Sequence, residues 1–476
     1  MATASTPVAA PPAPPWRSDL LARLPARAGL WLTALVLALG YVLLHNRLHI
    51  HYLDDAWTMS FVWTWVHDGV AADRIYRSDW ALTFGHGQFI LYGALLQLLG
   101  WSKGNALLIS TALMVGAAAC WYGICRAARW PREPAALTAL SLLLFYKCVE
   151  AANLARPDAM VLCLLSLALL LLARDRPLAA GLVAMAAVEV HPIGATTFFY
   201  LAAWLLHDRR RLLNHGALSR HLLWISVGVA VGALLIYSSR PEMLTVERLR
   251  AMAGDAGAVH GPPRTDFTWL DRHFRYHSQV EGAVFVAALL LYLARRLWRV
   301  DTLPLFALGG VLLAALLIRR PNGFYVLMAF PAFALICVRA LDDVRLLRLA
   351  FIALLLSFAI RAGWQGWQQR NYDYPATMAR VVHLVPEDGL PVVGLDDFWF
   401  GLRQRQFVPA NYADSFAALD LAAFYLLDSS VKPGGLAAIR REVADLYDIS
   451  PVAQFTDPGG QMVSLQRYRR RSRQTR

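Results

Sequence analysis

Long apolar runs recur along the first three quarters of this chain, and clusters of arginine separate them. A helix needs about 20 mostly apolar residues to cross the hydrocarbon core of a bilayer. Hydrophobic residues make up 57% of the 476 residues, far more than one soluble core needs. The sequence therefore predicts an all-α polytopic membrane protein whose surroundings are a lipid bilayer. The expected spans lie near residues 29–45, 105–125, 135–150, 158–173, 222–238, 280–294, 303–318, 324–338 and 347–362.

The arginine clusters indicate which runs cross. Residues 176–207 are basic at both ends and are interrupted at His191-Pro192, so we expect two short helices that cross outward and return. Residues 84–101 are long enough to cross, but a crossing there would place the later arginine clusters outside. We therefore expect this run to lie in the outer interface, within one long first loop at 48–103. The result is about eleven spans, with the amino terminus inside and the carboxyl terminus outside.

Composition divides the chain into three parts. Residues 1–27 are rich in Ala and Pro and are expected to form a disordered cytoplasmic lead before an uncleaved first span. Residues 28–363 form the predicted transmembrane domain, in which the polar loop at 238–279 is interpreted as a mobile cover over a site. Residues 364–476 are predicted to form a small soluble extracytoplasmic α/β domain. Its expected elements are helices at 376–385 and 436–446 and strands at 391–395, 424–427 and 462–465.

The net charge of +13 does not indicate a nucleic-acid partner, because the arginines lie in short clusters between apolar runs and not along one face. The five cysteines lie in or at the ends of apolar runs, and their spacing matches neither a disulfide framework nor a zinc site. His49 and His51 would alternate onto one side of an extended segment beside Asp54, which would suit a divalent cation, but this spacing is not specific. No cofactor is predicted.

Charged residues at the outer ends of the runs are the candidates for chemistry. Ionised groups near hydrocarbon are costly, and where they persist they usually face a cavity or a partner. Arginine binds phosphate oxygens through a bidentate fork, and a carboxylate can accept a proton from an attacking hydroxyl group. The candidate catalytic residues are Asp54, Asp55 and Asp158, and the candidate donor- and phosphate-binding residues are Arg156, Arg319, Arg320, Tyr325, His86 and His191.

Each candidate also has a structural interpretation. Asp54 and Asp55 could mark a helix start, and Asp158 could cap the helix that follows Arg156-Pro157. Arg319-Arg320 could anchor a helix at the interface, although they lie outside against the charge bias. His191 could serve only the helix break, and His86, between two glycines, could simply begin an interfacial helix.

Five short motifs, in this order, resemble membrane glycosyltransferases of the GT-C type, and in particular bacterial relatives of the protein O-mannosyltransferases and of the aminoarabinose transferase that modifies lipid A. The motifs are Asp54-Asp55-Ala-Trp57 with Gly69, Phe84-Gly-His-Gly87 before Tyr92, Ala155-Arg156-Pro-Asp158, His191-Pro192-Ile-Gly194, and Arg320-Pro-Asn-Gly-Phe-Tyr325 with Pro331. Together they cover roughly residues 30–340.

The resemblance implies a sugar donor on a polyprenyl phosphate, an inverting single displacement at an extracytoplasmic acceptor, Asp54 nearest the reaction and arginines near the donor phosphate. It also implies the bacterial cytoplasmic (inner) membrane, with the site and the carboxyl-terminal domain facing the periplasm. Two positions depart from the family pattern. His86-Gly87-Gln88 stands where the family often has an acidic residue or lysine followed by prolines, and His191 stands where lysine is frequent. These departures concern the identity of the sugar and of the acceptor.

Two other functions fit the same topology. A secondary transporter would use the broken helix at His191-Pro192 as part of a substrate path, but it should carry a matching break in an internal repeat, and the sequence has no second hairpin interrupted by proline. A ligase or polymerase that joins lipid-linked glycans shares the compartment, and the motif spacing does not separate it from a glycosyltransferase. The sequence identifies neither the sugar nor the acceptor, which could be a lipid, a glycan or a protein.

Overall fold

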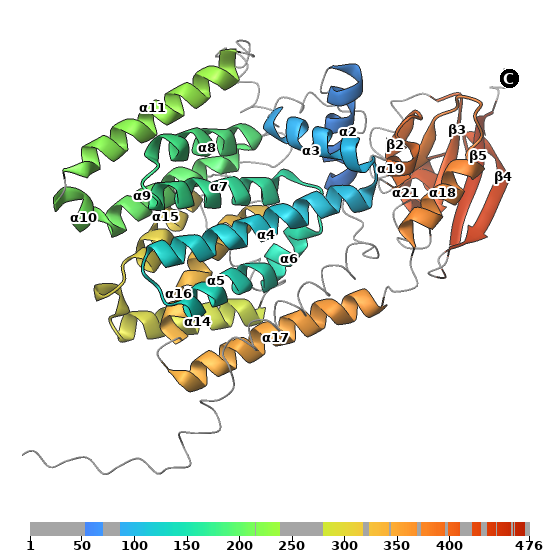
Figure 1. Cartoon of the computed structure of the whole chain (residues 1–476). Helices are drawn as coiled ribbons and strands as arrows, with labels where there is room; N and C mark the ends of the chain where they lie inside the picture. The colour runs from blue at the N-terminus through green and yellow to red at the C-terminus, as the bar shows by residue number, and fades with distance from the viewer. Residues whose placement is uncertain are drawn as a thin grey trace, which may run out of the picture.

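A helical bundle with a small α/β domain beside one of its ends makes up the described chain (Figure 1). The bundle contributes most of the helices, and a five-stranded sheet follows near the carboxyl end. The computed structural model describes residues 53–69, 86–214, 216–238, 279–317, 323–341, 344–368, 373–395, 398–409, 421–429, 436–443, 445–457, 460 and 462–471. The predicted first span at 29–45 and the predicted cover at 238–279 therefore lie outside the described residues.

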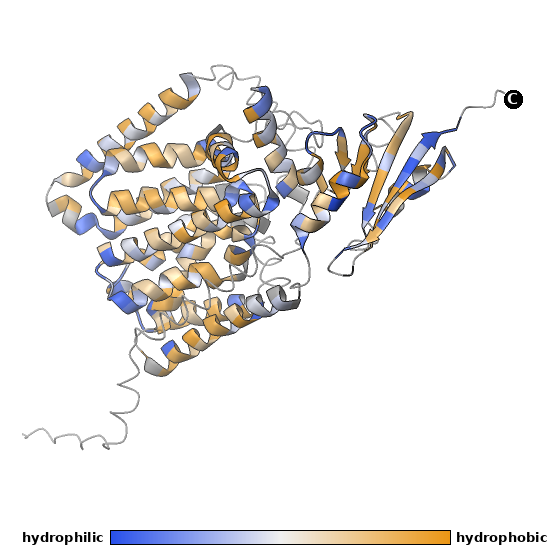
Figure 2. Ribbon diagram, turned by 45° about the vertical axis from the view of Figure 1, so that its right-hand side comes forward, coloured by the Kyte–Doolittle hydropathy of each residue, from blue (hydrophilic) through white to orange (hydrophobic). Residues whose placement is uncertain are grey.

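The long helices of the bundle follow the apolar runs of the sequence. Within the described chain, α4 and α11 are long and apolar enough to cross a membrane by themselves, and several shorter apolar helices accompany them. Figure 2 shows hydrophobic residues along the lengths of these helices and hydrophilic residues gathered near their ends. The bundle helices include α4 (Lys103–Ala127), α5 (Arg132–Leu144), α7 (Pro157–Ala173), α8 (Pro177–Val190), α9 (Thr196–His207), α10 (Arg209–Asn214), α11 (Ala217–Ser238), α14 (Gln279–Ala294), α15 (Leu303–Leu317), α16 (Phe330–Leu341) and α17 (Arg345–Gln368).

Helix α11 shows how these helices pack. Its leucines Leu234 and Leu235 are largely exposed, which suits contact with lipid better than contact with water. Its contact with α8 is made by glycines: a Cβ atom on Gly228 would lie 2.2 Å from the Leu178 carbonyl oxygen, and one on Gly181 would lie 2.3 Å from the Ile225 carbonyl oxygen. Small residues at a close helix crossing, with apolar side chains outside, are typical of packing inside a bilayer.

Two of the expected spans are interrupted. The run at 135–150 forms α5 and a separate short helix, α6 (Tyr146–Ala152), because Phe145 between them has an extended ψ of 138°. The run at 324–338 begins as a 3₁₀ helix, η6 (Gly323–Ala329), before α16 starts. Pro331 has no N–H group, so an α-helix cannot continue unbroken through that position.

The arginine clusters meet at one end of the bundle, where Asp301 connects several helices. Trp130 Nε1 donates a hydrogen bond of 2.6 Å to Asp301 Oδ2, and Arg339 Nε lies 3.8 Å from the same oxygen. His207, at the end of α9, has Nδ1 3.9 Å from Asp301 Oδ1. Arg348 of α17 pairs with Glu133 of α5 at 2.9 Å. The sequence expectation that these clusters share one end agrees with this geometry.

Helix α3 (His86–Leu99) lies across the opposite end of the bundle and does not cross it. The backbone N–H of Gly87 donates to Glu189 Oε2, near the end of α8, at 2.9 Å. Asn105 Nδ2, in the first turn of α4, donates to the carbonyl oxygens of Leu99 and Gly100 at 2.7 and 2.9 Å. Because α4 starts and α8 ends at the same end of the bundle, both ends of α3 lie there too, as the arginine count requires for residues 84–101.

The carboxyl-terminal domain lies beside the end that carries α3 (Figure 1). Its sheet has the order β2-β1-β3-β5-β4, in which β1 pairs in parallel with β2 and β3, and β5 pairs antiparallel with β3 and β4. One face packs against α18 and continues into the bundle core, and the other packs against α21. The elements are α18 (Tyr374–Leu384), β1 (Val392–Gly394), α19 (Trp399–Leu402), β2 (Phe407–Pro409), β3 (Ala423–Ser429), α21 (Ala437–Val443), β4 (Tyr447–Thr456) and β5 (Met462–Arg470).

The expected helices and strands of this domain are present, but two further strands, β2 and β4, are not anticipated by the sequence pattern. The helix expected at 436–446 ends at Val443, because Tyr447 begins β4. Pro451 makes residues 447–456 a poor match to a central strand. The structure accommodates it because β4 is the edge of the sheet and its register shifts between Pro451 and Ala453.

The topology yields a direct prediction at Arg129, which lies at the arginine-rich end between α4 and α5. We expect a reporter that is active only in the cytoplasm to be active when fused after Arg129, because basic residues flanking spans are retained inside. A fusion after Gly100, which precedes α4 at the opposite end, should be active only with an extracytoplasmic reporter. Activity of an extracytoplasmic reporter after Arg129 would reverse the predicted side of the membrane for every later loop.

Candidate active site

The site is built around the turn that joins α6 to α7. Pro157 is the first residue of α7, and the residue before a proline avoids helical backbone angles, so Arg156 is extended with φ −120° and ψ 162°. The carbonyl groups of this turn consequently need partners outside their own helix. Helix α4 supplies them: Ser110 Oγ donates to the Leu154 carbonyl oxygen at 2.6 Å, and Thr111 Oγ1 donates to that of Ala152 at 2.9 Å.

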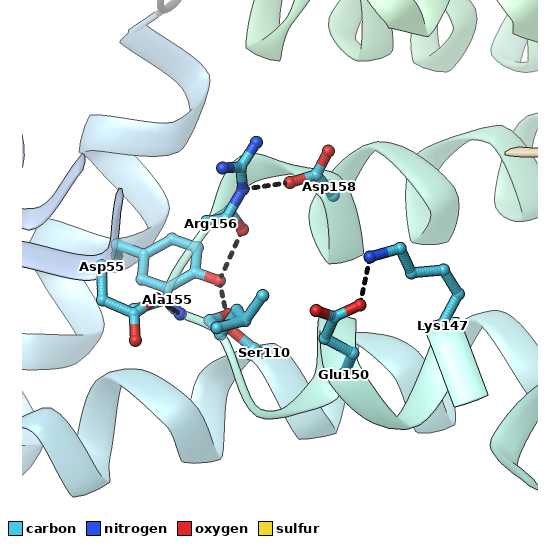
Figure 3. A network of polar contacts seen from close by, with 9 residues as sticks. Asp55, Ser110, Lys147, Glu150, Ala155, Arg156 and Asp158 are labelled. Carbon is cyan, nitrogen blue, oxygen red and sulfur yellow. Dashed lines mark hydrogen bonds and ion pairs between the residues drawn. The ribbon is translucent and has the colours of Figure 1, made fainter. Parts of the chain in front are cut away.

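The carboxylate of Asp55 fixes the same turn from the other side. Asp55 lies in the first turn of α2 (Leu53–Asp68), and its side chain is fully buried. The backbone N–H of Ala155 donates to Asp55 Oδ1 at 2.7 Å (Figure 3). The interaction joins the acidic pair of the first loop to the Ala155-Arg156-Pro-Asp158 motif, 100 residues later in the chain.

Arg156 and Asp158 form a buried ion pair next to this contact. Arg156 Nε donates to Asp158 Oδ2 at 2.7 Å, and both side chains are almost fully buried. Asp158 lies in the first turn of α7, where a carboxylate is favoured by the helix dipole. Its carboxylate accepts the hydrogen bond from the Arg156 guanidinium group, which lies just before the helix. Asp158 thereby fixes the orientation of Arg156 at the end of the bundle that carries α3.

Helix α3 contributes a tyrosine to the same cluster. Tyr92 is fully buried, and its hydroxyl lies 2.8 Å from Ser110 Oγ and 3.4 Å from the Arg156 carbonyl oxygen. Through Tyr92 the interfacial helix, α4 and the turn before α7 share one hydrogen-bond network. Displacing α3 would therefore disturb the backbone that carries Arg156.

His191 closes the cluster from the end of α8. The N–H of Ile193 donates to His191 Nδ1 at 3.1 Å, so the neutral ring carries its proton on Nε2. The ring lies close enough to Asp158 and Arg156 for their charges to interact. His191 thus serves the helix break, through Nδ1, and also belongs to the polar cluster.

Gln88 is the least satisfied group in this region. It is fully buried on α3, one helical turn before Tyr92, so the two side chains lie on the same face of the helix. Neither atom of its side-chain amide has a hydrogen-bond partner among the residues that the structure describes. A buried amide without partners costs free energy, and a bound ligand or a water molecule would remove that cost.

A second ion pair lies on the neighbouring helix. Lys147 Nζ bonds to Glu150 Oε2 on α6, one turn before the Asp55 contact with Ala155, as Figure 3 shows. Glu150 lies at the end of the apolar run at 135–150. The lysine gave no signal by itself, because a lysine three residues before a glutamate is common on any helix.

The structure thus brings together four of the sequence-predicted residues: Asp55, Arg156, Asp158 and His191. For the remaining predicted residues the structure describes no side-chain contacts. Asp54 lies in α2, His86 in α3 and Tyr325 in η6, but their side chains are outside the described part of the chain. Arg319, Arg320, His49 and His51 lie outside the described residues altogether.

Sequence reasoning missed Ser110, Gln88 and the role of Tyr92 in the network. Ser110 and Gln88 are polar residues within apolar helices, and this pattern alone makes them candidates for a polar site. Tyr92 appears in the second motif, but nothing in the sequence connects it with Ser110.

The described chain, a helical bundle with a small α/β domain beside one end, is similar in fold to solved structures of the GT-C type. The crystal structure of ArnT from Cupriavidus metallidurans in the apo state matches 92% of this chain and 98% of its own, with a TM-score of 0.59 and 16% sequence identity. The structure of the same protein bound to undecaprenyl phosphate matches 93% and 98%, with a TM-score of 0.59 and 17% identity. The apo oligosaccharyltransferase of Archaeoglobus fulgidus matches 88% of this chain and 72% of its own, with a TM-score of 0.49 and 12% identity.

No protein-family model and no curated protein matches the sequence. The resemblance to GT-C type enzymes that the short motifs suggested is confirmed at the level of the fold. At these identities the comparison establishes the fold alone.

Gln88 allows a test that separates binding from folding. We expect Gln88→Leu to leave the melting temperature of the substrate-free protein unchanged or higher, because an unsatisfied buried amide costs about 1–3 kcal/mol. Turnover should nevertheless fall at least about tenfold, the effect of losing one ligand hydrogen bond. Gln97→Leu, at an exposed position of the same helix, is the matched control. A lower melting temperature for Gln88→Leu would show that the amide stabilises the fold and does not serve a ligand.

Proposed function

We propose that this protein transfers a sugar from a polyprenyl-phosphate carrier to an acceptor outside the cytoplasm, by an inverting single displacement. The observation that carries the proposal is the gathering of Asp55, Arg156, Asp158 and His191 at one end of a bundle with the fold of ArnT. The ArnT structure bound to undecaprenyl phosphate supports a carrier of this kind.

In this proposal the donor phosphate lies at the outer end of the bundle, near Arg156. Asp158 holds Arg156 through Nε, so the guanidinium is oriented before the donor arrives. Preorganised cations that meet the charge developing on a leaving group lower the barrier more than flexible ones. Arg319, Arg320 and Tyr325 are proposed to share the phosphate, with His86 and His191 on the donor side.

Asp54 is proposed to act on the acceptor. A hydroxyl oxygen of the acceptor attacks the anomeric carbon opposite the phosphate, and the bond from that carbon to the phosphate oxygen breaks. Its electron pair leaves with the polyprenyl phosphate, and the proton of the hydroxyl passes to the Asp54 carboxylate. The carboxylate also favours the positive charge that develops on the sugar.

Asp55 receives a different role. Neighbouring residues on a helix point about 100° apart, so Asp54 and Asp55 cannot face the same group. Asp55 bonds to the backbone of the turn that carries Arg156, which makes it a positioning residue for the phosphate site. The active site and the α/β domain would then face the outside of the bacterial inner membrane, with the amino terminus in the cytoplasm.

The proposal predicts different defects for the two aspartates. We expect Asp54→Asn to lower single-turnover transfer roughly a hundredfold or more while donor affinity is retained, because it removes the base and not a donor contact. Asp55→Asn should be milder in turnover and should weaken donor binding, because it disturbs the Arg156 turn. Asp68→Asn, at an exposed position of α2, is the control. Full turnover of folded Asp54→Asn would remove Asp54 from the mechanism.

The activity itself is tested with the purified full chain, undecaprenyl-phosphate monosaccharides, and envelope lipids and glycoproteins extracted from a deletion strain. The proposal predicts loss of the monosaccharide donor, release of undecaprenyl phosphate and one added sugar on an acceptor. Transfer of longer glycans would instead assign a ligase or polymerase. Movement of a substrate across proteoliposomes without any change in the donor would assign a transporter.

A further inference from the structure

A groove separates the bundle from the carboxyl-terminal domain. One wall is the beginning of α4, with Lys103, Asn105 and Leu108, and the other comes from α18 and the residues around α19, with Met378 and Arg403. Its volume is about 820 Å³, within the range of ligand sites. The cluster of Asp55, Arg156 and Asp158 does not line it, so the groove is distinct from the proposed active site.

Two cations line the groove, and no carboxylate of the described chain does. Lys103 is buried, and its ammonium lies 5.5 Å from the centre of the Tyr374 ring. It occupies the first residue of α4, where the helix dipole disfavours a cation.

Arg403 reaches the groove from the other domain. Its guanidinium lies 4.9 Å from the centre of the Trp63 ring of α2, and its buried Nε has no hydrogen-bond partner in the described part of the chain. Burial lowers the pKa of Arg403, the direction expected of a cation that lacks a neutralising carboxylate. An arginine left in this condition is suited to an anionic group that the protein does not itself supply.

The groove continues onto a surface that faces lipid. Leu108 lines the groove and is 46% exposed, and on the same face of α4 follow Val115, 48% exposed, and Tyr122, 37% exposed. A spacing of seven residues places the three about 10 Å apart in one line along the helix. An acyl chain lying on this line would bring its headgroup to Lys103 and Arg403.

We propose that this groove binds one anionic membrane lipid, with the phosphate of its headgroup between Lys103 and Arg403 and an acyl chain along Leu108, Val115 and Tyr122. The lipid fastens the carboxyl-terminal domain to the bundle at the outer surface of the membrane. Its recognition is electrostatic at the headgroup and apolar along the chain, so a zwitterionic lipid of equal chain length binds more weakly.

The test measures lipids retained by the detergent-purified full chain, using native mass spectrometry with phosphatidylglycerol and phosphatidylcholine of identical chains. Phosphatidylglycerol should be retained at least about tenfold better by the unaltered protein, the ratio that 1.4 kcal/mol produces. Arg403→Gln and Lys103→Gln should each remove most of this preference, and Arg403→Lys, which keeps the charge, should retain part of it.

Arg380→Gln is the matched control, because Arg380 is an exposed cation of α18 that does not line the groove. Its lipid preference should equal that of the unaltered protein. Equal retention of the two lipids would reduce the groove to nonspecific apolar contact. An unchanged preference in folded Arg403→Gln would place the anionic lipid elsewhere and overturn the proposal. Neither result depends on sugar transfer.

Discussion

The hydrogen bond from the Ala155 N–H to the Asp55 carboxylate holds together the end of the bundle that carries α3. It joins the first described helix to the turn before α7, and that turn is also held by Ser110 and Thr111 of α4. Removing the acceptor would leave a buried backbone N–H unsatisfied, at a cost of about 1–3 kcal/mol. The orientation of Arg156, the Tyr92 contact and the closeness of His191 all depend on the position of this turn.

The distribution of polar groups in the rest of the bundle follows from the bilayer, which acts as its solvent. Polar groups are costly between the two ends, so they gather at the ends, where the arginines meet Asp301 on one side and the acidic cluster meets Arg156 on the other. Between them, glycine contacts such as Gly181 with Gly228 bring the helices close enough to pack without polar contacts. The two kinds of charged cluster thus lie at opposite ends of the bundle.

Much of this architecture is predictable from the sequence because lipid imposes a simple pattern. Apolar length and arginine position predict the helices, the surface position of α3 and the two-helix turn at His191-Pro192. The break at Phe145 is not predictable, since neither proline nor glycine lies near it. Strand β4 is not predicted because it contains Pro451. The proline is accommodated because β4 is an edge strand with a register shift at that position.

The candidate site is less predictable because its contacts are distant in sequence. The spacing of Arg156 and Asp158 hints at a pair, but nothing in the chain connects Asp55 to Ala155 or Tyr92 to Ser110 before the helices are packed. The unsatisfied amide of Gln88 is likewise a property of the folded helix. Sequence supplies the ionisable residues, and packing decides which of them bind a ligand and which hold the backbone in place.

Electron cryo-microscopy of the full-length protein, reconstituted in nanodiscs with a polyprenyl phosphate, would locate the phosphate. We expect the phosphate to lie at the end of the bundle that carries α3, in contact with Arg156 and close to the amino-terminal turn of α2. A phosphate bound instead at the arginine-rich end around Asp301, away from α2 and α3, would contradict the assignment of the active site.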